Sequence, residues 1–417
     1  MKTIVINERD STRTPFLRGI LIRSLLDAGL PFKEAYSLAS DMRDDLSEIP
    51  EITTQDLKGR VGERLRHDGH DEAFELYQSS AAAPARILVE SLNGAQAAFS
   101  RGKHERYLQA SGLKADKSEH TTELIYDQLL AAGVAHLTTG QLGCLTYRCL
   151  QQEMSKKAAE RYRVWFEFQR SSRPLLLLIN GAVGTGKSTI ATEAAHLLDI
   201  VRIQSTDMLR EVMRMMIPER LSPVLHCSSF NAWKALPIRD VKDRGRDQLI
   251  ADGYRSQAEL IAVACEAVMQ RAVEESVPMI LEGVHAYPEL GERAPHQSGA
   301  IIVQVTLAVL RPKELKARLR GRGVLVPQRR AKRYLAKFDS IWSLQSFLMS
   351  EADRYDVPII PNQDKDKAVL EVILQVIQEL SQHFDSEPES VFGDAAKDLV
   401  EQGPKTPWQD LVAGLAG

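Results

Sequence analysis

Residues 175–198, LLLLINGAVGTGKSTIATEAAHLL, join an apolar run to a glycine-rich turn and then to a helical pattern. The turn from Gly181 to Ser188 satisfies GxxxxGK[ST] and stands directly between a predicted strand and a predicted helix, as a phosphate-binding loop requires. Glycines let successive backbone N–H groups face an anion, and the helix N-terminus adds partial positive charge. Lys187 can reach the β- and γ-phosphates, and Ser188 can ligate Mg²⁺. The stretch predicts that the chain binds a nucleoside triphosphate. The predicted nucleotide-binding residues are Gly181, Gly184, Thr185, Gly186, Lys187, Ser188 and Thr189, of which Thr189 either supplements Ser188 or supports the helix start.

From about residue 172 onward, short apolar runs alternate with helical stretches. This spacing is typical of a parallel sheet with helices on both faces. We therefore predict an α/β fold with a parallel sheet and flanking helices over 166–384, preceded by a mainly helical N-terminal region. The runs are PLLLLING, IVRIQST, VPMILEG, GAIIVQVTL and VPIIPN.

The rest of the chain divides into three further segments. Residues 1–90 predict a small, mainly helical domain, and residues 91–165 predict a helical connecting region. LLAAGV at 129–134 echoes LLDAGL at 25–30, which indicates either a decayed internal repeat or coincidence in helical sequence. Residues 385–417 are acidic and broken by Gly and Pro, and we expect a mobile tail or a peripheral helix there.

Composition narrows the class of protein but not its function. With 53 basic and 56 acidic residues among 417, the net charge of −3 implies no global attraction to nucleic acid or to an anionic membrane. The four cysteines show no CxxC spacing, which favours a reducing compartment. The N-terminus has no apolar core of signal-peptide length, and no apolar run is long enough to span a bilayer. We expect a cytoplasmic protein that acts on a small anionic molecule, and the sequence leaves both a monomer and a homo-oligomer open.

Two carboxylates follow predicted strands at the edge where open α/β sheets bind ligands. Asp207 could orient or deprotonate an acceptor hydroxyl, or it could cap the following helix, a role for which Thr206 competes. Glu282 follows MIL, where an acid can hold a magnesium water or assist the acceptor; a structural salt bridge is the alternative. His285 lies near the same edge and is more typical of a local hydrogen-bonding residue.

Cationic side chains follow the second and fourth runs. Arg210 and Arg214 lie four residues apart, suited to an anionic substrate or to a solvated helix face. Residues 311–337 hold eleven Lys or Arg and a single acid, Glu314. This segment could be a lid that closes over the transferring phosphoryl group, a solvated surface or an RNA-binding run, and its position favours the lid. The lid candidates are Arg318, Arg322 and Arg329.

Four motifs together resemble one family. NGAVGTGKSTIA, STDMLREVMR, LHCSSFNAWKAL and LEGVH, in this order, are similar to the 2-phosphoglycerate kinases. The resemblance implies a P-loop kinase domain preceded by an ATP-cone-like domain over 1–90. It also implies transfer of the γ-phosphoryl group of ATP, with Mg²⁺, to the 3-hydroxyl of 2-phosphoglycerate, giving 2,3-bisphosphoglycerate. Glu8 and Ser11 depart from the ATP-cone pattern, in which a basic residue and a glycine are expected.

Within this resemblance, HCSSF supplies further donors for a doubly anionic acceptor, at His226, Ser228 and Ser229. Ser228 and Ser229 could equally cap a helix that begins near Asn231. The predicted catalytic residues are Lys187, Asp207, Glu282, Arg318 and Arg322, the predicted metal ligands are Ser188 and Glu282, and the predicted substrate-binding residues are Arg210, Arg214, His226, Ser228, Ser229 and Arg329. The alternatives are a kinase for another phosphorylated or carboxylated metabolite, an ATP-dependent regulatory protein, and a polynucleotide kinase or RNA-binding protein.

Overall fold

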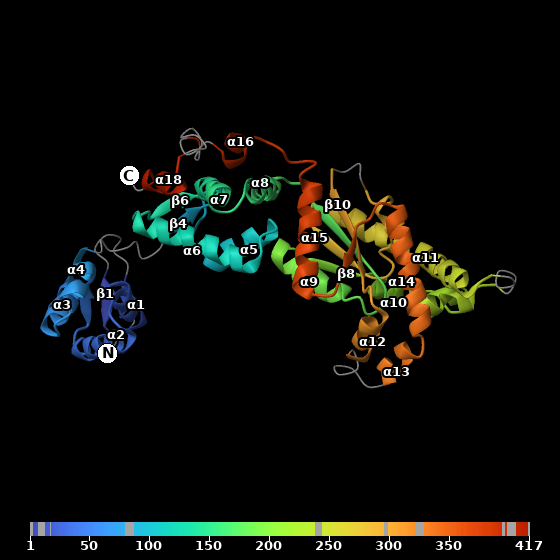
Figure 1. Cartoon of the computed structure of the whole chain (residues 1–417), viewed down its shortest axis with the longest axis horizontal. Helices are drawn as coiled ribbons and strands as arrows, with labels where there is room; N and C mark the ends of the chain where they lie inside the picture. The colour runs from blue at the N-terminus through green and yellow to red at the C-terminus, as the bar shows by residue number, and fades with distance from the viewer. Residues whose placement is uncertain are drawn as a thin grey trace. The chain divides into compact units, whose positions relative to one another are not determined.

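A computed structural model shows two compact units, residues 1–87 with 130–135 and residues 88–129 with 136–417 (Figure 1). It describes residues 3–6, 13–16, 18–79, 87–237, 244–295, 299–321, 329–393, 397 and 406–415. Arg322, Glu8 and Ser11 lie outside these ranges, and the side chain of Arg329 is not described.

The larger unit is built on a five-stranded sheet in which every pairing is parallel. The five predicted runs form its five strands, so the predicted α/β class is confirmed. The strand order β11-β10-β7-β9-β8 puts the strand before the glycine loop at the centre. The strands are β7 (Leu175–Asn180), β8 (Arg202–Ser205), β9 (Met279–Glu282), β10 (Ile301–Ala308) and β11 (Ile359–Pro361).

Helices cover both faces of this sheet, and β7 is buried along its whole length because it contributes to both cores. Leu176 and Leu178 pack into a core with α11 (Arg246–Glu274) and α14 (Phe338–Arg354). Leu175 and Leu177, which alternate with them, pack on the other face with α9 (Lys187–Leu198), α15 (Lys365–Leu380) and α8 (Lys156–Arg170). Figure 1 shows the strands between these two layers. The alternation follows from the two-residue period of a strand.

Shorter elements connect the strands and the long helices of this unit. They are α10 (Thr206–Met216), η1 (Pro223–His226) and η2 (Ser229–Ala235), with η4 (Pro288–Gly291), α12 (Pro312–Gly321) and α13 (Arg329–Leu335) further along the chain. Gly253 of α11 lets η2 approach closely, because a Cβ at this position would lie 2.1 Å from the backbone nitrogen of Trp233.

The smaller unit has a three-stranded sheet and four helices. β1 pairs antiparallel with β2 and parallel with β3, in the order β2-β1-β3. The helices pack around Leu25, Leu38 and Leu65, which are all buried. The elements are β1 (Ile4–Ile6), β2 (Arg13–Pro15), α1 (Arg18–Asp27), α2 (Phe32–Asp45), β3 (Glu51–Thr53), α3 (Thr54–His67) and α4 (Asp71–Ser79).

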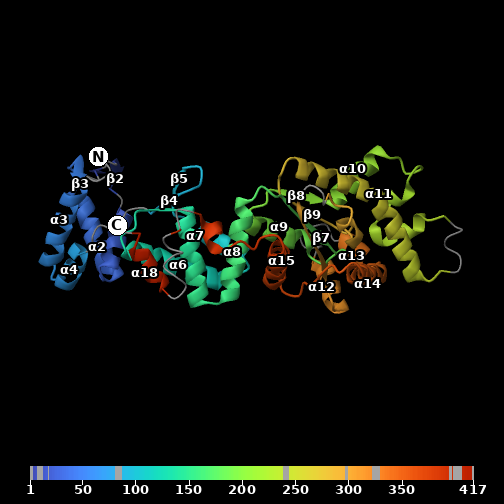
Figure 2. The same ribbon diagram turned by 90° about the horizontal axis from the view of Figure 1, so that it is seen from above.

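Residues 88–170 have the same order of elements as the smaller unit. β4 pairs antiparallel with β5, both labelled in Figure 2, and parallel with β6, again as a three-stranded sheet. This segment is therefore more than the helical connection that the sequence predicts. The elements are β4 (Leu88–Glu90), β5 (Gln96–Ala98), α5 (Arg101–Ala110), α6 (Ala115–Ala131), β6 (His136–Thr138), α7 (Thr139–Glu153) and α8.

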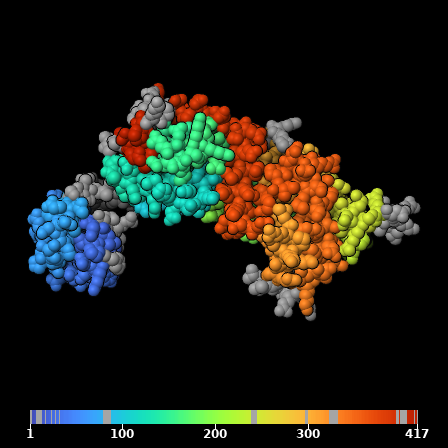
Figure 3. Space-filling view, in the orientation of Figure 1, coloured from blue at the N-terminus to red at the C-terminus, as the bar shows by residue number. Residues whose placement is uncertain are grey.

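Two short helices near the C-terminus, α16 (Pro388–Phe392) and α18 (Trp408–Ala413), contact α7. Phe392 and Trp408 are buried. The indole Nε1 of Trp408 donates to Glu153 at 3.1 Å, and Gln152 donates to the carbonyl oxygen of Thr406 at 2.7 Å. In the space-filling view this red segment lies against the green residues of α7 and α8 (Figure 3). Its described part is thus packed within the larger unit, against α7 and α8.

Candidate active site

The glycine loop follows β7 at the carboxyl edge of the sheet and needs glycine for steric reasons. Gly181, Gly184 and Gly186 have φ values of +150°, +91° and +92°, which residues with a Cβ rarely adopt. A Cβ on Gly181 would also lie 2.5 Å from the carbonyl oxygen of Leu307. Gly186 stands at the N-cap of α9, so the loop leads into a helix N-terminus. The predicted strand, loop and helix are therefore in place.

The base of the loop is fixed by hydrogen bonds from distant segments. Asn362, just after β11, donates from its side-chain nitrogen to the carbonyl oxygen of Thr185 at 2.7 Å. Arg318 of α12 donates to the same oxygen at 3.4 Å and also to the carbonyl oxygen of Asn362. The buried hydroxyl of Thr185 donates to the carbonyl oxygen of Ala182 at 3.0 Å. Thr185 thus supports the loop through its side chain, and Arg318 lies against the loop.

Lys187, Ser188 and Thr189 begin α9 at the open side of the loop. The ammonium group of Lys187 donates to the carbonyl oxygen of Ala182 at 3.1 Å, so this side chain folds back along the loop. Ser188 and Thr189 are exposed. The position of Lys187 agrees with the phosphate-binding role that its motif predicts.

Ser188 at the start of α9 contacts Glu282 at the end of the adjacent strand β9. The register of β7 and β9 places Ile179 opposite Glu282, and the Ser188 hydroxyl donates to the Glu282 carboxylate at 3.0 Å. Glu282 is only 7% exposed. A hydroxyl and a carboxylate oxygen are ligands that Mg²⁺ accepts, and the remaining ligands in such sites come from phosphates and water. Accordingly, the described residues contain no cluster of three or more His, Cys, Asp or Glu side chains that could hold a metal by itself.

Asp207 lies in the first turn of α10 with its carboxylate 66% exposed. The N-cap of this helix is Ser205, without a side-chain capping bond, so neither Asp207 nor Thr206 has the predicted alternative role as the cap. The guanidinium Nε of Arg210 lies 3.9 Å from the Asp207 carboxylate. Asp207 therefore faces solvent at the carboxyl edge of β8.

The predicted substrate-binding residues gather near α10 but differ in their contacts. Arg210 is one-fifth exposed and donates to the carbonyl oxygen of Cys227 at 2.7 Å. Arg214 forms an ion pair with Glu211 on the same helix. His226 donates from Nε2 to the carbonyl oxygen of Ile217 at 2.9 Å, which ties η1 to the end of α10.

Ser228 stands at the N-cap position of η2, and its side chain makes no capping bond to this helix. The Ser228 hydroxyl instead accepts a long hydrogen bond, 3.4 Å, from Arg333 of α13. Ser229 begins η2 and is buried. Two basic residues of the segment 311–337 thus have defined positions. Arg333 lies near Ser228, and Arg318 lies near the glycine loop.

A group of buried polar side chains, Thr206, Gln257 and His285, lies next to α10. In the sequence only His285 points to this group. His285 follows β9 and contacts Gln257 and Thr206. Burial lowers the pKa of His285 to about 3, so its imidazole is neutral at physiological pH. His285 could be suspected from its place after LEGV, whereas Gln257 and Asn362 act over distances that no local pattern reveals.

A central parallel strand, a glycine loop leading into a helix, and an acid on the adjacent strand beside the loop serine are the features of a P-loop nucleotide-binding fold, a class that includes phosphotransferases. The 2-phosphoglycerate kinase of Methanopyrus kandleri is 31% identical over 322 residues, which cover 77% of this chain and 96% of that protein. The 2-phosphoglycerate kinase of Pyrococcus furiosus is 32% identical over 286 residues, which cover 67% of this chain and 89% of that protein. No family model matches the chain. The chain belongs to the 2-phosphoglycerate kinase family.

Proposed function

We propose that this kinase transfers the γ-phosphoryl group of ATP to the 3-hydroxyl of 2-phosphoglycerate and releases ADP and 2,3-bisphosphoglycerate. The chemistry is carried by one observation, the 3.0 Å contact between Ser188 and the Glu282 carboxylate beside the glycine loop. The acceptor is taken from the relatives named 2-phosphoglycerate kinase.

The donor side uses the loop amides and Lys187 to bind the triphosphate. Ser188 and Glu282 would hold Mg²⁺, which when bound neutralises charge on the phosphate oxygens. Arg318 contacts the loop from α12, and we assign it as the lid arginine on the donor side. Arg322 and Arg329 complete the proposed lid from the residues that follow α12.

On the acceptor side, Asp207 would accept the proton of the 3-hydroxyl as the hydroxyl oxygen bonds to the γ-phosphorus. The bond from that phosphorus to the β,γ-bridging oxygen breaks, and ADP takes its electron pair. An acceptor with a phosphate and a carboxylate needs several cations and donors nearby. The proposed groups are Arg210, Arg214, His226, Ser228, Ser229 and Arg329.

We further propose that residues 1–90 form an ATP-cone-like domain and that residues 166–384 form the kinase domain. The small sheet with four helices supports the first assignment, and the parallel sheet supports the second. All four cysteines are free thiols, which fits the proposed cytoplasmic location. Within the described residues, no helix has the length and apolar character needed to cross a bilayer.

The test is ATP consumption and product mass with 2-phosphoglycerate, 3-phosphoglycerate, glycerate or no acceptor, each with and without Mg²⁺. We expect turnover with 2-phosphoglycerate only, dependent on Mg²⁺, and a bisphosphorylated product. Turnover with another acid would keep the kinase and replace its acceptor. ATP binding without any acceptor-dependent turnover would favour an ATP-dependent regulatory protein instead.

A further inference from the structure

A buried network of hydrogen bonds connects the start of α10, the residues after β9 and the loop between η1 and η2. His285 Nε2 lies 2.9 Å from the side-chain oxygen of Gln257, and His285 Nδ1 lies 3.4 Å from the hydroxyl of Thr206. The side-chain nitrogen of Gln257 donates to the carbonyl oxygens of Val224 at 2.6 Å and Cys227 at 3.0 Å. Gln257, His285 and Thr206 are completely buried.

The hydrogen-bonding partners of Gln257 and His285 allow only one placement of the hydrogen atoms on these two side chains. Backbone carbonyls only accept, so the Gln257 nitrogen must face Val224 and Cys227, and its oxygen must face His285. His285 Nε2 must then carry the proton, and Nδ1 must accept from the Thr206 hydroxyl. A neutral, directional chain of this kind rigidifies the segments that it joins, because every buried group is satisfied only in one geometry.

The hydrogen-bonded network ends at residues that adjoin the proposed acceptor site. Thr206 directly precedes Asp207, and it packs against Gly283, the residue after Glu282, so closely that a Cβ there would lie 1.8 Å from its hydroxyl oxygen. Cys227 also accepts from Arg210 at 2.7 Å and is followed by Ser228. One buried network thus fixes the start of α10, the loop from η1 to η2, and the strand end with Glu282.

We propose that Gln257 and His285 are positioning residues for the acceptor: they hold Asp207 and the 224–228 loop in register with Glu282 without touching substrate. This rests on the proposed acceptor site. The glycine loop and its supports Asn362 and Arg318 share no hydrogen bond with the network in the described structure, so we expect the network to affect acceptor binding more than ATP binding.

The test compares Gln257→Leu and Gln257→Glu with Gln270→Leu, a control on the exposed side of the same helix, where Gln270 contacts only Glu274 among its described hydrogen bonds. Both Gln257 substitutions remove the side-chain N–H groups that donate to the carbonyl oxygens of Val224 and Cys227. These oxygens then keep the 3.3 Å bond from Cys227 N and the 2.7 Å bond from Arg210, and the lost bonds disfavour the bound geometry of the loop. We expect KM for 2-phosphoglycerate to rise about tenfold or more and kcat to fall, while the Kd for ATP changes less than about twofold. Equal losses for ATP and acceptor, or no change in acceptor KM, would overturn the proposal.

Hydrogen exchange provides a readout that does not depend on the acceptor's identity. In both Gln257 variants, amides of 206–216 and 222–230 should exchange faster than in the native protein, while those of 181–190 remain unchanged. Unchanged exchange in the first two segments would reject the positioning role even if no acceptor were turned over. Failure of the native protein to phosphorylate 2-phosphoglycerate, in contrast, would count against the proposed function alone.

A second inference concerns the fold that occurs twice. Thr53 and Thr138 cap α3 and α7 in the same way, accepting from Asp56 N at 3.1 Å and Gln141 N at 3.2 Å. The following threonines donate to the last residues of β1 and β4, Thr54 to Ile6 O at 3.1 Å and Thr139 to Glu90 O at 2.7 Å. These matches align α3 and α4 with α7 and α8, so that each residue of the first pair corresponds to the residue 85 positions later, as Thr53 corresponds to Thr138.

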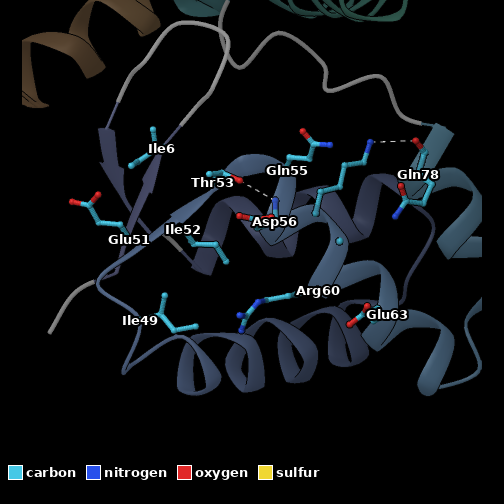
Figure 4. A pocket seen from close by; sticks show the side chains of 12 residues that line it. Ile6, Ile49, Glu51, Ile52, Thr53, Gln55, Asp56, Arg60, Glu63 and Gln78 are labelled. Atoms are coloured by element: carbon cyan, nitrogen blue, oxygen red, sulfur yellow. Dashed lines mark hydrogen bonds between the residues drawn. The ribbon is translucent and has the colours of Figure 1, made fainter.

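The face of α3 and α4 in the smaller unit and the corresponding face of α7 and α8 have different surroundings. In the smaller unit, Gln55 and Gln78 line a cavity of about 1080 Å³ (Figure 4). Their counterparts are Gly140, whose Cβ would lie 2.2 Å from the carbonyl oxygen of Phe392, and Arg163, which pairs with Asp385 at 2.8 Å. The polar cavity face of one copy is therefore a protein contact in the other.

We infer that the described residues 385–393 and 406–412 are the permanent occupant of this face on α7 and α8. Gly140→Ala should displace them, and Gly102→Ala in α5, where a Cβ meets nothing within 4 Å, is the control. We expect faster proteolysis and hydrogen exchange over these residues in Gly140→Ala only. Phe392→Ala should give the same result without altering α7, and native-like protection of these residues in both variants would overturn the inference.

Discussion

At the scale of single residues, Lys187 is expected to be indispensable for turnover. Its ammonium group lies along the loop, and removing it leaves the β- and γ-phosphates without their cation. Lys187→Ala should lower kcat by at least about a hundredfold, since electrostatic stabilisation of this kind contributes several powers of ten. Unfolding curves should match those of the native protein, and turnover that persists in a folded variant would withdraw the site assignment.

Asp207 is expected to act on the acceptor rather than on ATP. Asn at this position keeps the shape but cannot take the proton of the hydroxyl, and general bases contribute about a hundredfold or more. Asp207→Asn should therefore reduce kcat by that order and leave the Kd for ATP nearly unchanged. Kinetics combined with ATP titration separates the two effects, and a pure loss of ATP affinity would move Asp207 out of the acceptor site.

Glu282 is expected to determine the requirement for Mg²⁺. The Glu282→Gln side chain can still accept from Ser188 but lacks the charge that holds a cation. Half-maximal activity should then need about tenfold more Mg²⁺ or greater, with Glu274→Gln on the exposed end of α11 as control. An unchanged Mg²⁺ titration would place the metal on other residues.

At the scale of elements, the contact of η2 with α11 depends on Gly253. Adding a methyl group 2.1 Å from a backbone nitrogen forces η2 away from the helix. We expect Gly253→Ala to cost about 1–3 kcal/mol of unfolding free energy, as overpacking does, and to raise KM for the acceptor. Denaturant unfolding and kinetics measure both. Gly245→Ala, where a Cβ meets nothing within 4 Å, should leave the KM for the acceptor unchanged.

The elements also show how far sequence reasoning reaches. Five strands and the glycine loop were predictable because buried parallel strands are continuous apolar runs and the loop motif has a fixed spacing. The sheet of β4, β5 and β6 was not, because LVE, QAA and HLT mix polar and apolar residues and form no continuous apolar run. Support of the loop by Asn362 spans 177 positions, so no local pattern could reveal it.

The repeat illustrates a register error. The matched segments LLDAGL and LLAAGV do not occupy the same place in the two folds, because 25–30 spans the end of α1 whereas 129–134 spans the end of α6. The counterpart of LLDAGL is LQASGL at 108–113, where Gly112 follows α5 with a φ of +88°, as Gly29 follows α1 with +89°. A common origin of the two segments stays a prediction, although their topology is the same.

At the scale of the whole molecule, two buried histidines should control stability in acid. Burial lowers the pKa of His104 to about 4 and that of His285 to about 3, below the ordinary 6.5 of the unfolded chain. As pH falls below 6.5, the unfolded state gains these protons first, so stability present at neutral pH is lost progressively. Each histidine should contribute about 1.4 kcal/mol per pH unit over that range.

Urea unfolding at pH 7 and pH 5 checks this expectation. His104→Gln should be less stable than the native protein at pH 7, because the His104 ring bonds to Thr122 at 2.9 Å and to Thr146 at 3.1 Å. Its loss of stability between the two pH values should be smaller. Replacement of exposed His120 by Gln should leave the pH dependence as it is, and an equal slope in His104→Gln would refute the assignment.

The contact of α16 and α18 with α7 also has a consequence for biosynthesis. Ribosomes make the chain from its N-terminus, so α7 leaves the exit tunnel well over two hundred residues before Phe392 and Trp408. During that interval Gly140 and its neighbours face water or a chaperone, and at about 5–20 residues per second the wait is on the order of ten seconds or more. Nascent chains of this kinase should therefore engage holding factors for most of their synthesis.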